Sequence, residues 1–98
     1  MGIVSFANKG TEDIFEGEDS RKARQTCPAT LWDVARRKLD QLNAAIRLSD
    51  LRLPPSNHLE TLKGDRKGQH SLRINQQYRL CFEWTDNGPA DVEIVDYH

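Results

Sequence analysis

The hydrophobic pattern of the chain changes period near its middle, and this change limits the folds that it can adopt. Over residues 29–49, apolar side chains recur every three or four positions, which is the spacing of one face of a helix. From Gln69 onward, apolar and polar side chains alternate, as they do along strands that are buried on one face. This order predicts an α+β fold in which helices pack on a mostly antiparallel sheet. A length of 98 residues allows one domain, over residues 1–98.

Two helices are expected in the N-terminal half. Asn8 or Thr11 can cap a short helix that ends at Gly17. The longer helix is expected over Ala29–Ser49, with Thr30 opening a sequence that resembles a capping box. Its apolar stripe consists of Leu31, Val34, Ala35, Leu39, Leu42 and Ile46.

Two further segments of the N-terminal half carry weaker signals. Ile3–Phe6 is a short apolar run, which is typical of a first strand. Glu18–Gln25 is highly charged, so we expect it to form an exposed loop.

The C-terminal half predicts three strands with short connections, the last over Asp91–Tyr97. Alternation assigns each strand residue to one of two faces. The face toward the helix should carry Leu72, Ile74, Leu80, Phe82, Val92 and Ile94. The opposite face should carry Ser71, Arg73, Arg79, Cys81, Glu83, Glu93, Val95 and Tyr97.

Basic side chains are concentrated in one part of a chain whose formal net charge is only −1. Between Thr61 and Cys81 there is one acid, Asp65, and there are five basic residues, namely Lys63, Arg66, Lys67, Arg73 and Arg79. The residues that follow, up to the end of the chain, include five acids and no lysine or arginine. Such a block indicates a local site for an anion, although many charge clusters are only solvated surface.

The predicted polar face has the chemistry to cleave RNA. RNA supplies its own nucleophile, the 2′-hydroxyl, so an enzyme needs in-line positioning, a base, an acid and cations for the developing charge. Arg79 and Arg73 can hold phosphate oxygens in a forked geometry, and Lys63 adds a point charge. His98 can transfer a proton near neutral pH, and Tyr97 can stack on a base or pass a proton.

Plainer explanations exist for the same residues. Asp96 can accept a proton or orient a partner, but the last three residues are also consistent with a loose chain end. Arg79 can instead pair across the sheet with Glu93, and His70 can simply pack on the sheet. The sequence shows no metal-ligand spacing and no phosphate-binding glycine loop, so no metal and no cofactor are expected.

The cysteine usage and the lack of apolar runs bear on the compartment. Cys27 and Cys81 lie far apart in the sequence and are expected to be buried or half-buried thiols in a reducing cytosol. No targeting segment or membrane span is visible, so a cytoplasmic protein without membrane contact is expected.

Four blocks of the C-terminal half resemble, in order and spacing, the HigB-type toxins of the RelE-like family. The blocks are Leu62–Gly68, Ser71–Asn75, Gln77–Phe82 and Val95–His98. The resemblance is strong over residues 59–98 and weak over residues 18–50. It implies the RelE-like fold, in which two N-terminal helices pack on a small, mostly antiparallel sheet with a concave basic face.

The resemblance also implies a function and a set of partners. Members are toxins of type II toxin–antitoxin systems that cut mRNA in the decoding site of the ribosome by 2′-hydroxyl attack, without a metal, and so inhibit translation. A HigA-like helix-turn-helix antitoxin holds them inactive and contacts operator DNA. The implied partners are therefore the antitoxin, the ribosome and mRNA, with operator DNA reached only through the antitoxin. The charged segment Glu18–Gln25 and the helix surface near Arg36 and Arg37 are candidate antitoxin contacts.

Carried over by position, the implied catalytic or substrate-positioning residues are Lys63, Arg79, Asp96, Tyr97 and His98. Further RNA contacts are expected from Arg66, Lys67, Arg73 and His70. Two positions depart from the family pattern. Glu60 lies where some members have a histidine, and His70 lies where many have tryptophan or tyrosine. An acid at residue 60 should weaken phosphate binding.

Two alternative functions remain open from the sequence. Glu60, His70 and the near-neutral charge are compatible with a module that occupies the ribosome or a partner without cutting RNA. A gyrase-directed toxin of the same fold is the other alternative, but the terminal Asp96, Tyr97 and His98 favour the RNA-cleaving branch.

Overall fold

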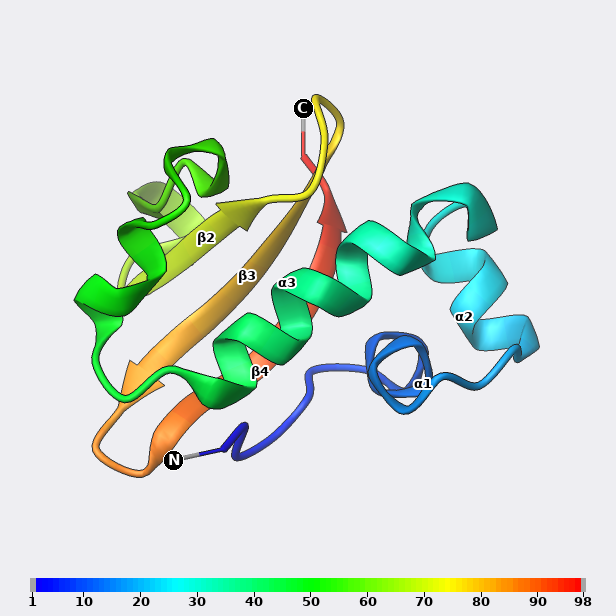
Figure 1. Cartoon of the computed structure of the whole chain (residues 1–98), viewed down its shortest axis with the longest axis horizontal. Helices are drawn as coiled ribbons and strands as arrows, with labels where there is room; N and C mark the ends of the chain where they lie inside the picture. The colour runs from blue at the N-terminus through cyan, green and yellow to red at the C-terminus, as the bar shows by residue number, and fades with distance from the viewer. Residues whose placement is uncertain (1, 98) are drawn as a thin grey trace.

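The computed structural model describes residues 2–97 and confirms the α+β fold. Three helices come first, and a four-stranded antiparallel sheet follows. The helices are α1 (Lys9–Glu16), α2 (Arg21–Thr26) and α3 (Trp32–Ala44). The strands, which lie side by side in chain order, are β1 (Glu60–Thr61), β2 (Gln69–Arg73), β3 (Tyr78–Thr85) and β4 (Gly88–Asp96). Figure 1 shows α3 lying across one face of this sheet, with α1 and α2 to one side.

The first helix begins and ends as predicted. The Asn8 side chain accepts a hydrogen bond from the Thr11 N–H at 2.9 Å, and Gly17 ends the helix in a left-handed conformation with φ of 78°. Ile14 is fully buried, so α1 contributes directly to the core.

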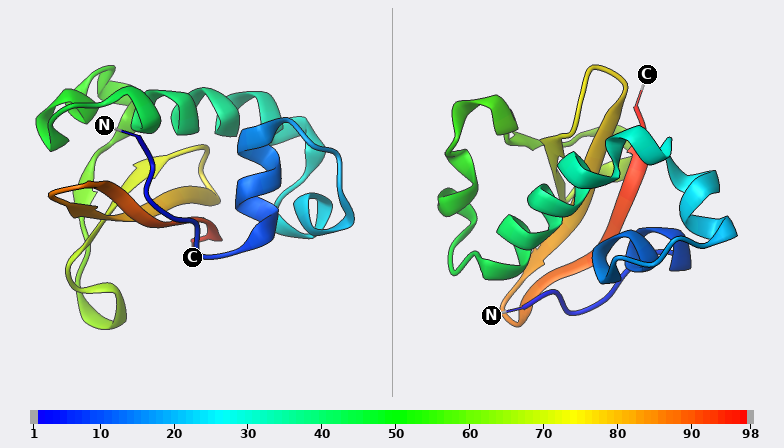
Figure 2. Two further views of the ribbon diagram at one scale, coloured as in Figure 1. Left: turned by 90° about the horizontal axis from the view of Figure 1, so that it is seen from below. Right: turned by 45° about the vertical axis from the view of Figure 1, so that its right-hand side comes forward.

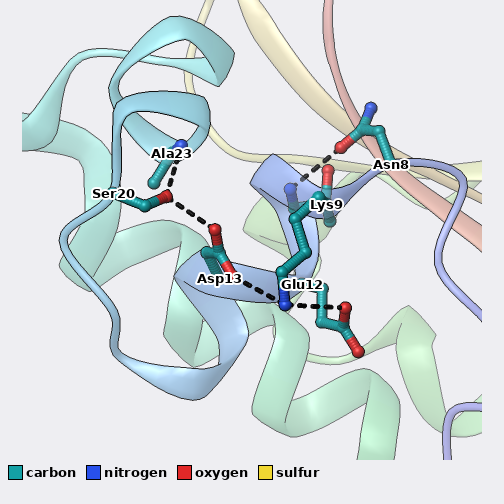
Figure 3. A network of polar contacts seen from close by, with 7 residues as sticks. Asn8, Lys9, Glu12, Asp13, Ser20 and Ala23 are labelled. Carbon is teal, nitrogen blue, oxygen red and sulfur yellow. Dashed lines mark hydrogen bonds and ion pairs between the residues drawn. The ribbon is translucent and has the colours of Figure 1, made fainter.

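The expectation of a loop over Glu18–Gln25 is wrong, because most of that segment forms α2. Ser20 makes the helix possible: its Oγ accepts from the Ala23 N–H at 3.0 Å and donates to Asp13 Oδ2 at 2.6 Å (Figure 3). This one hydroxyl caps α2 and joins it to α1. Ala23 is fully buried, so a single small side chain supplies the inner face of this short helix.

The long helix is shorter than predicted. Residues Ala29–Leu31 form a 3₁₀ turn, and α3 ends at Ala44, five residues before Ser49. The predicted capping box is absent, since Leu31 occupies the cap position and caps nothing with its side chain. At the other end, Asp50 Oδ2 accepts from the Ile46 N–H at 3.0 Å and from the Arg47 N–H at the same distance, which turns the chain into another 3₁₀ segment.

The apolar stripe of this helix is confirmed from Leu31 to Leu42 and fails at its last member. Ala35, Leu39 and Leu42 are fully buried, and Leu31 and Val34 are half-buried against them. Ile46 lies beyond the helix end and is 68% exposed.

The two faces of the sheet follow the predicted alternation on the side toward α3. The buried core there consists of Leu72, Ile74, Leu80, Phe82, Val92 and Ile94. The last strand starts at Gly88, three residues earlier than predicted, and β1 was not predicted. The expected strand over Ile3–Phe6 is reduced to one bridge, between Phe6 and Val92, although backbone hydrogen bonds on both sides hold this segment along β4.

The face of the sheet opposite α3 is less open than predicted. Ser71 and Cys81 are completely buried there. The left view of Figure 2 shows α3 on one side of the sheet and the loop between β1 and β2 projecting on the other. From that loop, Arg66 reaches Glu93 at 3.3 Å, and it donates to Gln69 Oε1 at 3.0 Å.

Both cysteines are free and buried, as expected. Burial raises the pKa of the Cys27 thiol to about 11, and burial also raises the pKa of Cys81. Both side chains therefore act as small core residues at neutral pH.

Candidate active site

Arg79 is the most firmly placed basic side chain on the face opposite α3. It lies in β3 between Arg73 of β2 and Val95 of β4. Its Nε donates to Ser71 Oγ at 2.8 Å, and its Nη2 donates to the carbonyl oxygen of His58 at 2.6 Å. Only 12% of the side chain is exposed. The guanidinium is thus held in one orientation before any ligand arrives, which is the condition for electrostatic preorganisation.

One edge of this guanidinium faces a hollow of about 270 Å³. The hollow is lined by His58, Glu60, Arg73, Asn75, Gln76, Arg79 and Tyr97. The Arg79 Cζ lies 5.8 Å from the centroid of the Tyr97 ring, a cation–π distance. The backbone N–H of Tyr97 donates to the Gln77 carbonyl at 2.6 Å, which fixes the end of β4 against the β2–β3 hairpin. Two guanidinium groups and an exposed aromatic ring therefore share one hollow.

Glu60 is the acidic member of this group. Its Oε1 lies 3.6 Å from Arg79 Nη1, and its side chain is 54% exposed. An exposed pair at this distance contributes little to stability, roughly 0–1 kcal/mol, so the carboxylate can be displaced by a stronger anion. Residue 60, where the sequence departs from the family pattern, therefore contacts Arg79 directly, at the edge where this side chain meets the hollow.

Arg73, Arg79 and Tyr97 are brought together as the sequence predicted, but two other candidate catalytic residues lie apart from them. Lys63 is exposed at the start of the loop between β1 and β2 and does not line the hollow. Asp96 pairs in register with Tyr78, one residue out of phase with Arg79, and its Oδ2 accepts from Gln77 Nε2 at 3.1 Å. It therefore belongs to the opposite alternation from Tyr97. His98 lies outside the described residues.

The remaining predicted RNA contacts are spread over two faces. Lys67 is exposed on the same loop as Arg66, whose charge is paired with Glu93. The alternative pairing of Arg79 with Glu93 is wrong, because Glu93 lies opposite Cys81 and contacts Arg66.

His70 faces away from Arg79. Its ring lies 5.9 Å from that of Phe82, and its Nδ1 is 3.2 Å from Thr61 Oγ1. Burial lowers its pKa. It lines a separate hollow of about 640 Å³ with Leu48 and Arg52.

Sequence reasoning missed four residues of the hollow around Arg79: His58, Glu60 as a direct contact, Asn75 and Gln76. The two-residue strand β1 is too short to show alternation, so no periodic pattern indicated that residues 58 and 60 would face Arg79, and only the family resemblance drew attention to Glu60. The pairing of Glu60 with Ser71 brings them there. The signal that could have indicated Asn75 and Gln76 was their position in the turn between two predicted strands, next to Arg73.

Two general properties of the described chain complete this description. Across residues 2–97, no three His, Cys, Asp or Glu side chains gather where they could hold a metal ion. No helix within the same range has the length and apolar character that crossing a membrane requires.

Comparison with known proteins identifies relatives over nearly the full length. One curated relative, toxin HigB-1 of Vibrio cholerae, is 41% identical over 95 residues, which cover 97% of this chain and 96% of the relative. Endoribonuclease HigB of Proteus vulgaris is 27% identical over 96 residues, covering 98% of this chain and 99% of the relative.

A solved structure shares the fold. A chain of the YoeB–YefM complex from Staphylococcus aureus superposes with a TM-score of 0.54 at 19% identity, and the match covers 100% of this chain and 97% of that one. The family model described as the RelE-like toxin of the type II toxin–antitoxin system HigB matches residues 4–98. The chain therefore belongs to the HigB-like family of RelE-like toxins of type II toxin–antitoxin systems.

Proposed function

We propose that this toxin is a ribosome-dependent endoribonuclease that cleaves mRNA by attack of the 2′-hydroxyl on the adjacent phosphate. The observation that carries the proposal is the fixed Arg79 guanidinium, which faces a hollow with Arg73 and Tyr97 in its wall. The name of the Proteus vulgaris relative, an endoribonuclease, supports the same reaction.

The roles follow from the chemistry of the side chains. As the 2′-oxygen attacks, negative charge grows on the non-bridging phosphate oxygens, and a guanidinium aimed at them lowers the barrier. Arg79 supplies that charge, and Arg73, opposite it in the sheet, is close enough to share the phosphate. Tyr97 offers an exposed ring on which a base can stack. The products are a 2′,3′-cyclic phosphate and a free 5′-hydroxyl.

The remaining candidates receive supporting roles in this proposal. His98 follows Tyr97 and is assigned the proton transfer, since an imidazole changes charge near neutral pH. Asp96 is assigned a positioning role, because its hydrogen bond to Gln77 ties the end of β4 to the hairpin. Lys63 and Lys67, exposed on the projecting loop, contact phosphates further along the RNA or the ribosome.

The family also bears on regulation. We propose that a HigA-like helix-turn-helix antitoxin binds this toxin, silences it and carries it to operator DNA. Action on ribosomes places the protein in the cytoplasm.

The contact between Glu60 and Arg79 favours a second candidate, a toxin that occupies the ribosome without cutting. A carboxylate 3.6 Å from the guanidinium competes with phosphate for the same charge. In this case the Arg79 hollow would bind RNA too weakly for in-line attack.

Primer extension on mRNA bound to programmed ribosomes separates the two. The nuclease produces new 5′ ends within the codon of the decoding site. Stalled ribosomes without new 5′ ends would support the non-cleaving toxin and overturn the nuclease proposal. Cleavage of the same mRNA without ribosomes would retain the reaction but remove the ribosome dependence.

A further inference from the structure

The hollow around Arg79 continues beyond Arg73. A second hollow, of about 390 Å³, adjoins it and is lined by Val34, Lys38, Ser56, His58, Arg73, Ile74, Asn75 and Gln76. Four of these residues also line the first hollow: His58, Arg73, Asn75 and Gln76. The two hollows therefore adjoin one another between the loop at residues 56–58 and the β2–β3 hairpin, and the pair, here called the groove, reaches α3 through Val34 and Lys38. In Figure 1, the hairpin tip lies at the same end of the molecule as the end of β4.

The groove has a basic lining. Lys38, His58, Arg73 and Arg79 line its walls, and Glu60 is the acidic side chain that lines it. Glu60 belongs to the Arg79 hollow, so among residues 2–97 the second hollow has Lys38 and Arg73 with no carboxylate in its lining. Charge of this sign suits an anionic chain that enters from the Arg79 hollow.

Lys38 is held in place within the groove. Its Nζ donates to the Asn57 Oδ1, and Asn57 itself is completely buried. The Asn57 amide donates to the carbonyl oxygens of Leu51 at 3.1 Å and Leu53 at 3.2 Å, and to Gln41 Oε1 at 3.1 Å. A buried side chain with this many partners is a rigid support, so the ammonium group occupies a defined position.

His58 stands where the two hollows meet. It has a left-handed backbone conformation, with φ of 45° and ψ of 56°, which is uncommon for a residue other than glycine. Its N–H donates to the Pro55 carbonyl at 3.1 Å, and its own carbonyl accepts from Arg79. Strained backbone of this kind persists only where the surroundings enforce it, and it is concentrated at functional sites. Here it turns the chain from the 3₁₀ segment Pro55–Asn57 into β1 and places His58 in the lining of both hollows.

We propose that the second hollow is a nucleotide subsite, in which single-stranded RNA that leaves the Arg79 hollow passes His58 and places its next phosphate between Arg73 and Lys38. The inference rests on the proposed function and extends it, since it gives the path that the RNA strand takes across the protein. The volume of the second hollow lies within the range of small-ligand pockets, about 300–1,000 Å³. An acidic protein segment has similar charge, but a single cation pair beside an apolar wall of Val34 and Ile74 suits one phosphate and one base better than a row of carboxylates.

The test compares two RNA probes that cannot be cleaved. A 2′-O-methyl dinucleotide spans the Arg79 hollow alone, and a 2′-O-methyl tetranucleotide spans both hollows. Binding is followed by NMR at several salt concentrations. Lys38→Gln should weaken the tetranucleotide roughly fivefold and make its salt dependence shallower by about 0.7 in log–log slope, the value for one lost phosphate contact on a single strand. Dinucleotide binding should not change.

Arg37→Gln is the matched control, because Arg37 is the preceding residue of α3, is exposed, and faces a different hollow with Asp33 and Asp40. If Lys38→Gln disturbs Asn57 and the fold, the unmodified toxin still decides the question. The tetranucleotide, and not the dinucleotide, should shift the amide signals of Ser56 and Val34.

Four results would overturn the subsite. The first two are an equal loss of affinity for both probes in Lys38→Gln, and a loss of tetranucleotide affinity in Arg37→Gln equal to that in Lys38→Gln. The third is unchanged tetranucleotide affinity in Lys38→Gln. The fourth is displacement of the tetranucleotide by an acidic peptide that shifts only the amide signals of residues lining the second hollow. Failure of the proposed function has a different signature, in which a folded Arg79→Ala variant binds both probes as tightly as the unmodified toxin. If Arg79→Ala weakens both probes and Lys38→Gln weakens neither, the second subsite alone is wrong.

Discussion

Replacing Asn57 with alanine should lower the free energy of unfolding more than the replacement of any nearby polar residue. The amide is completely buried and connects its own loop to two other segments, to residues 51–53 through the carbonyl oxygens of Leu51 and Leu53, and to α3 through Gln41 and Lys38. Its two amide protons cannot serve three acceptors fully, so we count two donated bonds and one accepted from a cation. Alanine removes these and leaves the Leu51 carbonyl buried without a donor, at a cost of about 1–3 kcal/mol for that group alone.

We discount the Lys38 bond, since the ammonium group that loses Asn57 in the variant can be hydrated instead. The expected loss in the free energy of unfolding is then roughly 2–4 kcal/mol. For a domain of this size, this corresponds to a fall in Tm of roughly 10–20 °C.

Urea denaturation followed by circular dichroism measures the effect directly. Asn87→Ala is the control, because Asn87 lies exposed in the β3–β4 turn, and its loss should stay within about 0.5 kcal/mol. A change of less than about 0.5 kcal/mol for Asn57→Ala would refute the argument that this amide supports the loop carrying His58.

Three further predictions test the packing and the electrostatics. Leu39→Ala should destabilise the protein by about 2–5 kcal/mol, because Leu39 is fully buried. Ile46→Ala should leave the urea midpoint nearly unchanged, because Ile46 is 68% exposed. Similar losses in the two variants would mean that α3 continues past Ala44. Gly10→Ala should cost about 1–3 kcal/mol by thermal denaturation, because the new Cβ would lie 2.6 Å from the Lys22 carbonyl oxygen and force α1 from α2; an unchanged Tm would contradict that close approach. The urea midpoint should fall as the pH is lowered from about 7.5 to 5.5, because burial lowers the pKa of His70 and the unfolded chain therefore takes up more protons than the folded one below about pH 6.5. His70→Gln should reduce this fall in the midpoint. An equal fall in the variant would show that His70 is not its source.

Much of the fold follows from local pattern. The alternation of Leu80 and Phe82 with Arg79 and Cys81 correctly assigned both faces of β3, because strand periodicity is a geometric property of the backbone. Asn8 and Gly17 likewise delimit α1, since caps satisfy backbone groups at fixed positions.

The failures arise where a single side chain decides between two local structures. Ser20 converts a charged stretch into α2 through bonds to Ala23 and Asp13. The contact with Asp13 joins residues seven positions apart, one in α1 and one at the cap of α2, so it becomes visible only in three dimensions. Asp50 ends α3 early by binding the N–H groups of Ile46 and Arg47, in competition with continued helix.

The candidate site was predicted in part for the same reason. Arg73, Arg79 and Tyr97 share a face by alternation, so their meeting was predictable. Residues His58 and Glu60 reach Arg79 through a two-residue strand and a left-handed turn, neither of which leaves a periodic signal. Asp96 shows the limit of reasoning from spacing, because neighbouring residues of a strand point to opposite faces even where both resemble a family motif.

The most direct test of the account is the rate of mRNA cleavage on programmed ribosomes by the Arg79→Ala variant, with its fold verified by circular dichroism. If the fixed guanidinium stabilises the charge that develops on the phosphate, the rate should fall by about 10²-fold or more while the protein stays folded. A folded Arg79→Ala variant that cuts at the rate of the unmodified toxin would contradict the central claim that this side chain forms the phosphate site.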